Sequence, residues 1–163
     1  MSNYKELKKA NIEVGKEKGD AGIAKGEQRV RELQSVKSLI DSMYFKDEID
    51  SAQADMLERS YLQAGKEAHQ REVKDVVDSA KDDLERNKAD IVAERLNVEN
   101  AIDKVGDMKG ATDLARNEAS NVERNLQKSA AEHGRMETLT ENIETEQESK
   151  SRNILNRIEN IFG

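Results

Sequence analysis

One pattern of apolar positions, with the heptad spacing of packed helices, runs from Val77 to Ile161. In steps of seven residues it contains Val77, Leu84, Ile91, Val98, Val105, Thr112, Ala119, Leu126, His133, Thr140, Gln147, Ile154 and Ile161. Interleaved apolar positions are Ala80, Ala101, Met108, Ala115, Val122, Met136 and Ile143. A repeat of about 3.5 residues is typical of long helices packed side by side, and the chain has no proline to break them. We therefore predict an all-α fold, an elongated antiparallel helical bundle or coiled coil of about three long helices.

Two turns are predicted between these helices. Residues 45–48 precede Ser51, where the apolar positions restart in a new phase, and either Asp47 or Asp50 is placed to cap the next helix. A second turn is predicted at residues 106–110, because the two glycines there cost a helix about 2 kcal/mol relative to alanine. The apolar register passes through this segment without a slip, so one uninterrupted helix is the alternative.

The turns predict a single helical domain, residues 1–163, with helices at about 3–45, 50–105 and 111–162. At about 1.5 Å per residue the last two would each span about 80 Å, and their similar length favours an antiparallel hairpin. This topology places the C-terminal tail beside the first turn. It predicts one cluster of bulky side chains there: Met43, Tyr44, Phe45, Ile49, Met56, Tyr61, Ile154, Leu155, Ile158, Ile161 and Phe162.

The stretch from Glu144 to Asn153 contains no apolar side chain. A helix that is polar on all sides makes little contact with a core. We expect this stretch to be solvated or mobile, with the apolar tail anchored after it. His133 and Gln147 lie on the seam itself, where polar residues specify register more often than they bind metal.

Composition limits both the core and the kind of partner. Charged residues make up 37% of the chain and aromatic residues 3%, which suits a thin seam between helices. The net charge is −7, yet residues 1–37 carry nine basic and six acidic side chains. This basic segment is expected to lie along the acidic helices of the same chain. The acidic remainder argues against nucleic acid as a partner.

The sequence lacks two features that would indicate where the protein is located. No run of residues approaches the roughly 18 apolar residues of a membrane span, and the N-terminal residues lack the apolar core of a signal peptide. Cysteine is absent, which excludes disulfides and thiol chemistry. We expect a protein without an integral membrane segment that is cytoplasmic, or secreted without a cleaved signal peptide.

Four glycines, Gly15, Gly19, Gly22 and Gly26, follow the heptad spacing. On a helix they would form a smooth seam that another backbone can approach closely, which predicts a groove for a partner helix. The other interpretation is that residues 1–26 form a flexible arm, because four interior glycines cost a helix roughly 3–4 kcal/mol.

The C-terminal tail is a second candidate for binding a partner. It is amphipathic in a helix, and its apolar residues are Ile154, Leu155, Ile158, Ile161 and Phe162. These residues either dock in the cluster at the first turn or form an exposed recognition element.

No arrangement of residues indicates catalysis. The two histidines, His69 and His133, have no glutamate three residues earlier and do not form a His-Glu-x-x-His motif. The glycines lack the strand context that phosphate-binding loops need. We therefore expect no enzyme activity, no cofactor, no bound metal and no small-molecule substrate.

An all-helical, acidic and cysteine-free chain of this kind resembles the WXG family and the helical accessory proteins of type VII secretion. Tyr44 and Glu48, in the segment Tyr-Phe-Lys-Asp-Glu, resemble the Tyr-x-x-x-Asp/Glu secretion signal of that group. The family's Trp-x-Gly motif is absent, and its signal normally follows the hairpin. The resemblance implies an accessory or targeting partner in specialised bacterial secretion.

These observations favour a non-enzymatic protein that packs against a partner helix or a helical cargo, or that forms a homo-oligomer. The alternative is a structural coiled-coil spacer, a tether or a component of a self-assembling rod, without a dedicated cargo.

Overall fold

The computed structural model describes residues 2–108 and 113–163 of the chain. Its helices are α1 (Ser2–Phe45), α2 (Ser51–His69), the π-helical turn η1 (Gln70–Lys74), α3 (Asp75–Asp107) and α4 (Asp113–Phe162). Because α2, η1 and α3 follow one another without a break, the described residues form three continuous helical runs and contain no strand. The predicted all-α fold of about three long helices is confirmed.

The first turn lies where the sequence predicts it. Helix α1 ends at Phe45, and Asp47 adopts a left-handed conformation with φ of 58°. Asp50 caps α2: its carboxylate accepts a hydrogen bond from the Gln53 backbone N–H at 2.8 Å. The Gln53 side chain in turn accepts from the Asp50 backbone N–H at 2.9 Å, which completes a capping box.

The chain also reverses direction between α3 and α4. Arg95 pairs with Glu137 at 2.6 Å and Lys88 pairs with Glu141 at 2.9 Å, so later residues of α3 face earlier residues of α4. This antiparallel arrangement excludes the uninterrupted helix. Helix α3 ends at Asp107, while residues 109 and 110 of the predicted turn lie outside the described residues.

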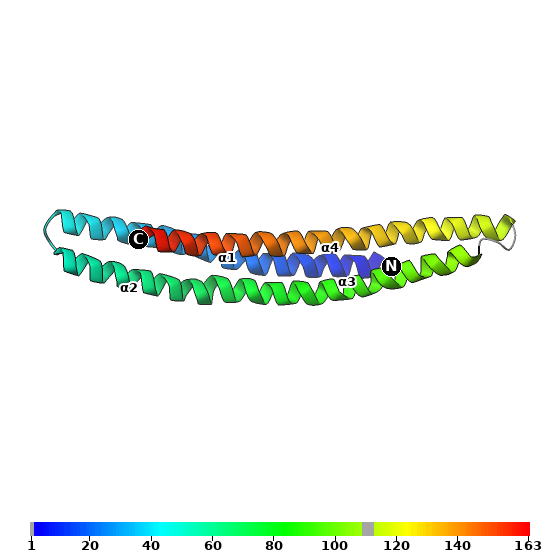
Figure 1. Cartoon of the computed structure of the whole chain (residues 1–163), viewed down its shortest axis with the longest axis horizontal. Coiled ribbons are helices and arrows are strands. Elements are labelled where there is room, and N and C mark those ends of the chain that lie inside the picture. The colour runs from blue at the N-terminus through cyan, green and yellow to red at the C-terminus, as the bar shows by residue number, and fades with distance from the viewer. Residues whose placement is uncertain (1, 109–112) are drawn as a thin grey trace. The chain divides into compact units, whose positions relative to one another are not determined.

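The chain divides into two compact units. Unit 1 consists of Met1–Glu13 and Asp83–Ile143, and unit 2 consists of Val14–Asp82 and Glu144–Gly163. Helices α1, α3 and α4 each contribute residues to both units. Within each unit the contributing helical segments run side by side (Figure 1).

Unit 1 has a thin apolar core between three helical segments. It is formed by Ile12, Leu84, Ile91, Met136 and Ile143. Polar contacts along the same seam fix how α1 lies against α3, since Lys8 pairs with Asp90 at 3.0 Å and Asn11 donates to Asn87 at 3.2 Å. Because the residue number rises on one helix as it falls on the other, these two segments are antiparallel.

Unit 2 has the larger apolar core. Its buried members are Ile23, Val30, Leu33, Val73, Val77, Ile154 and Ile158. Leu62, Ile161 and Phe162 pack against this cluster and are partly buried. Arg29 pairs with Glu72 and Lys37 pairs with Glu58, which places α1 antiparallel to the α2–η1 run.

The polar stretch from Glu144 to Asn153 is a helical part of α4, and most of its side chains are exposed. The expectation that it is solvated on all sides is wrong. Gln147 and Ser151 are buried in unit 2. The Gln147 side-chain amide donates to the Lys16 carbonyl at 2.9 Å, and the His69 Nε2–H donates to the Ser151 carbonyl at 2.9 Å. The stretch therefore lies against α1 and α2 through polar groups instead of apolar ones.

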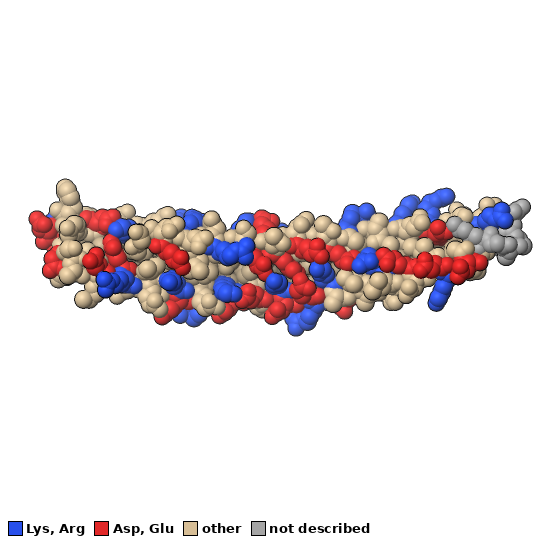
Figure 2. All heavy atoms as spheres, viewed as in Figure 1, with Lys and Arg blue, Asp and Glu red and all other residues tan. Residues whose placement is uncertain are grey.

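Both signs of charge are interspersed over the helices on the face seen in Figure 2. Cross-helix ion pairs account for part of this mixture, such as Lys5 with Glu132 in unit 1 and Arg157 with Glu27 in unit 2. No helix within the described ranges combines the length and the apolar character needed to cross a membrane.

Candidate functional site

The four glycines of the predicted groove are all helical and buried within unit 2. A Cβ atom on Gly22 would lie 3.0 Å from Val76 Cγ1, and one on Gly26 would lie 2.8 Å from both Ile154 Cδ1 and Val73 Cγ2. The seam is thus packed against helices of the same chain. Binding of a further partner helix by these glycines stays a prediction.

The π-helical turn η1 explains part of this close packing. It lies opposite the glycine seam, since the Glu72 carbonyl oxygen would be 3.3 Å from a Cβ atom on Gly22. A π-turn widens the helix locally and moves its backbone outward. Glycines on the facing helix leave the room that this widening needs.

The apolar tail is docked inside unit 2. Ile154 and Ile158 are fully buried, and Ile161 and Phe162 are half-buried against the same core. Leu155 is half-buried as well. The tail is thus docked, but against the core of unit 2 and not in the cluster predicted at the first turn. Binding of a separate partner by the tail stays a prediction.

The cluster predicted beside the first turn forms only in part, and that expectation is wrong for four of its members. Tyr44 is 52% exposed, Phe45 87%, Met56 69% and Tyr61 39%. The reason is the stagger of the helices in unit 2. Arg157 of α4 pairs with Glu27, and α4 ends at Phe162, so the last turns of α1 extend past the end of α4 (Figure 1).

The resulting two-helix end of unit 2 is the most apolar exposed part of that unit. Large apolar side chains that are mostly or substantially exposed gather there, and we call them the hairpin-end residues: Leu39, Tyr44, Phe45, Met56 and Tyr61. Both residues of the predicted secretion signal, Tyr44 and Glu48, are exposed at this end.

Two hairpin-end residues lie on the same faces of α1 and α2 that α4 covers nearer to the middle of these helices. Gly26 faces Ile154 of α4, and Tyr44 lies eighteen residues, or about five helical turns, after Gly26 on α1. Gly65 of α2 faces Ile158, and Tyr61 precedes Gly65 by about one turn. Tyr44 and Tyr61 therefore lie on the same side of the hairpin as Gly26 and Gly65, the side against which α4 packs. Helix α4 ends before it reaches the two tyrosines.

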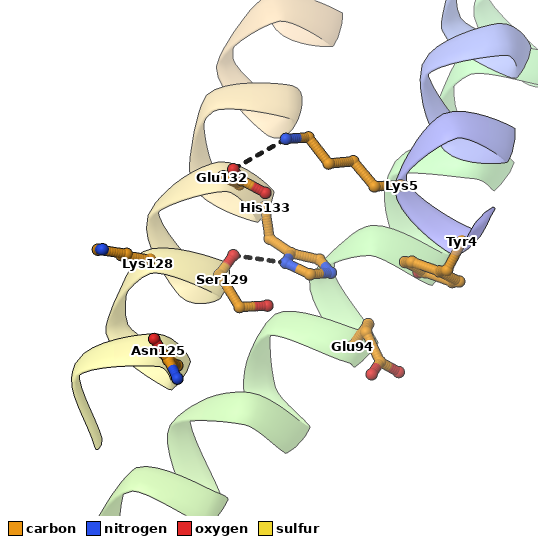
Figure 3. A pocket seen from close by; sticks show the side chains of 8 residues that line it. All are labelled: Tyr4, Lys5, Glu94, Asn125, Lys128, Ser129, Glu132 and His133. Atoms are coloured by element: carbon orange, nitrogen blue, oxygen red, sulfur yellow. Dashed lines mark hydrogen bonds and ion pairs between the residues drawn. The ribbon is translucent and has the colours of Figure 1, made fainter. Parts of the chain in front are cut away.

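A cavity of about 290 Å³ lies in unit 1, where the start of α1 meets α3 and α4. Figure 3 shows its lining, which includes Tyr4, Lys5, Glu94, Ser129, Glu132 and His133. Lys5 and Glu132 pair across its edge at 2.8 Å. The Lys128 side chain points away from the other lining groups (Figure 3).

His133 is the most buried polar group beside this cavity, with 5% of the residue exposed. Its Nδ1 lies 2.7 Å from the Ser129 carbonyl oxygen, one turn earlier on α4. A carbonyl only accepts, so Nδ1 carries a proton, which makes Nε2 the acceptor of a neutral ring. Nε2 is buried and has no hydrogen-bond partner among the described residues.

Tyr4 forms the opposite wall. Its ring stacks on the His133 ring with 5.8 Å between centroids, and Lys8 Nζ lies 5.4 Å from the Tyr4 ring centroid. The Tyr4 hydroxyl donates to the Asp90 carbonyl at 3.2 Å. Burial raises the pKa of Tyr4, and the negative charges of Glu94 and Asp90 raise it further.

Little in the sequence indicates this cavity. The heptad pattern places His133 on the seam as a register-specifying residue, and its burial agrees with that position. Tyr4 and Glu94 lie far from it in sequence, so only the packing of α1 against α3 and α4 brings them together. No group of three or more His, Asp or Glu side chains in the described ranges is arranged to hold a metal ion.

No protein-family model matches the chain, and no curated protein or solved structure shows a significant match to it.

Proposed function

We propose that the protein is a non-enzymatic helix-binding protein, and that the hairpin-end residues of unit 2 accept an amphipathic helix of a partner protein. The observation that carries the proposal is the exposure of Tyr44 and Tyr61 on the side of the hairpin that α4 covers elsewhere. Exposed aromatic and methionine side chains at one place are typical of protein-binding surfaces.

The charge at this end favours a basic partner. The turn and the start of α2 carry Asp47, Glu48, Asp50 and Asp55 against the single base Lys46, and all five are exposed. A helix with an apolar stripe for the tyrosines and basic residues beside the stripe complements both features. The same excess of acidic side chains disfavours pairing of the hairpin end with the hairpin end of a second copy of the protein.

The proposal includes an accessory role in type VII-like secretion, in which the partner would be a helical cargo. The exposed positions of Tyr44 and Glu48 are compatible with such a signal. In a bacterium with a type VII system, export of the protein with Tyr44→Ala and Glu48→Ala should fall relative to the unchanged chain. Equal export of both would remove the secretion part of the proposal and leave helix binding.

Helix binding is tested by titration with a designed peptide that has leucines at helical spacing and lysines beside them. The Tyr44→Ser and Tyr61→Ser variants should each bind this peptide about tenfold more weakly, because an exposed aromatic anchor contributes roughly 1–2 kcal/mol. Leu7→Ser is the matched control, since Leu7 is 56% exposed on the same helix but belongs to unit 1. Equal binding by all of the variants would contradict the proposal.

The second candidate is the structural spacer or self-assembling rod. It predicts that the protein associates with itself without any peptide, and that Tyr44→Ser reduces this association. Sedimentation equilibrium separates the two candidates, since the helix-binding proposal expects no effect of Tyr44→Ser on the mass of the free protein.

A further inference from the structure

His133, which lines the unit 1 cavity, carries a buried ring nitrogen that the described residues do not satisfy. His133 is held by its bond to Ser129, which places a proton on Nδ1 and leaves Nε2 as the acceptor of a neutral ring, and Nε2 is buried. A buried acceptor without a donor destabilises a fold, so a group that donates to it is stabilising when it binds.

A carboxylate lies beside the same space. Glu94 is half-buried, and it forms no hydrogen bond or ion pair with the described residues. In Figure 3 its side chain lies next to the Tyr4 ring, on the α3 side of the cavity. Together with burial, the negative charge of Glu94 raises the pKa of Tyr4.

The cationic groups nearby are engaged elsewhere or point away. Lys5 is paired with Glu132, Lys8 is paired with Asp90, and Lys128 points out of the cavity (Figure 3). The polar groups left beside the cavity are therefore one nitrogen without a partner, His133 Nε2, and one carboxylate, Glu94. This combination matches a ligand that is cationic and donates hydrogen bonds.

We propose that this cavity binds a primary ammonium group, which donates to His133 Nε2 and pairs with the Glu94 carboxylate. A metal ion fits less well, because the described residues supply no third His or carboxylate ligand. The ammonium belongs either to a small free amine or to a lysine side chain of a partner protein. The site is separate from the hairpin end of unit 2 and does not depend on the helix-binding proposal.

The two histidines make the site measurable by NMR of the imidazole nitrogens. His69 donates from Nε2 to the Ser151 carbonyl, so the two rings hold opposite tautomers, and a His69→Gln variant assigns the signals. The whole chain is titrated with n-butylammonium chloride, with 1-butanol at matched ionic strength as the neutral control. Blocked lysine, Nα-acetyl-lysine methylamide, is titrated in parallel.

We expect the His133 ring to carry a proton on Nδ1, and the Nε2 signal to shift with n-butylammonium but not with 1-butanol. Glu94→Gln should weaken that binding about tenfold or more, because one charge-assisted hydrogen bond is lost. Tighter binding of blocked lysine than of n-butylammonium supports the site with a protein source, and the reverse order supports it with a free amine.

Three results would overturn the proposal. The first is a His133 ring that carries its proton on Nε2. The second is an equal response to 1-butanol and n-butylammonium. The third is unchanged n-butylammonium binding in Glu94→Gln, provided that circular dichroism shows the variant to be folded.

Discussion

The side-chain amide of Gln147 lies in the space that a Cβ atom on Gly19 would occupy. From there it donates to the Lys16 carbonyl and to Asp20 Oδ1, at 2.9 Å and 3.3 Å. Burial alone would raise the pKa of Asp20, but hydrogen bonds from Lys16 and Gln147 outweigh it and lower that pKa. The glycine seam of α1 thus admits a buried polar side chain of α4 as well as apolar ones.

A first prediction contrasts two glycines in helix interiors. Gly26→Ala should lower the free energy of unfolding by about 1–2 kcal/mol, because overpacking Ile154 and Val73 outweighs a gain of about 1 kcal/mol in helix propensity. Gly134→Ala should instead raise it by up to about 1 kcal/mol, since nothing lies within 4 Å of its new Cβ atom. Urea denaturation of both variants checks the pair, and stabilisation by both would contradict the tight seam.

A second prediction separates the docked tail from the exposed end of the hairpin. Ile158→Ala should cost about 2–5 kcal/mol of unfolding free energy, because Ile158 is fully buried in unit 2. Phe45→Ser, at an exposed side chain, should change it by less than about 0.5 kcal/mol. Thermal and urea denaturation measure both effects. A large loss in Phe45→Ser would mean that the hairpin end is already covered.

Much of the fold could be predicted from the sequence because the heptad pattern reports which side of each helix is buried. Val77, Leu84, Ile91, Val98 and Ile154, all on the predicted seam, are buried. The cap of the second helix at Asp50 could be predicted because Asp50 and its partner Gln53 are close in sequence.

The features that the sequence does not predict depend on contacts between distant segments. Gln147 and Ser151 are buried because their partners, the Lys16 carbonyl and His69, come from other helices. The exposure of Phe45 depends on the stagger of α4 against α1, which the sequence pattern does not report. The π-turn at residues 70–74 and the cavity beside His133 likewise have no local signature.

A third prediction concerns the loss of folding stability at acidic pH. Burial lowers the pKa of His69 from its ordinary 6.5, although the hydrogen bond to the Ser151 carbonyl and the charge of Glu159 oppose the shift. Below pH of about 6.5 the unfolded chain therefore binds a proton that the folded chain does not. This contribution to stability is present above that pH and is lost as the pH falls through the lowered folded value.

The matched variant for this effect is His69→Gln, whose amide can still donate to the Ser151 carbonyl but does not titrate. Unfolding free energies of both proteins at pH of about 7.5 and about 5.5 give the comparison. The unchanged chain should lose more stability between these values than the variant does. Identical losses would show that His69 titrates normally in the folded state.

The most direct test of the helix-binding account is hydrogen exchange of the full chain with and without the basic amphipathic peptide. Docking on the hairpin-end residues should slow backbone exchange in residues 39–61 and leave the remaining segments of α1, α3 and α4 unchanged. A peptide with the same leucines but glutamates in place of the lysines should protect this region far less. Protection that lies elsewhere, or that is equal for both peptides, would contradict the account.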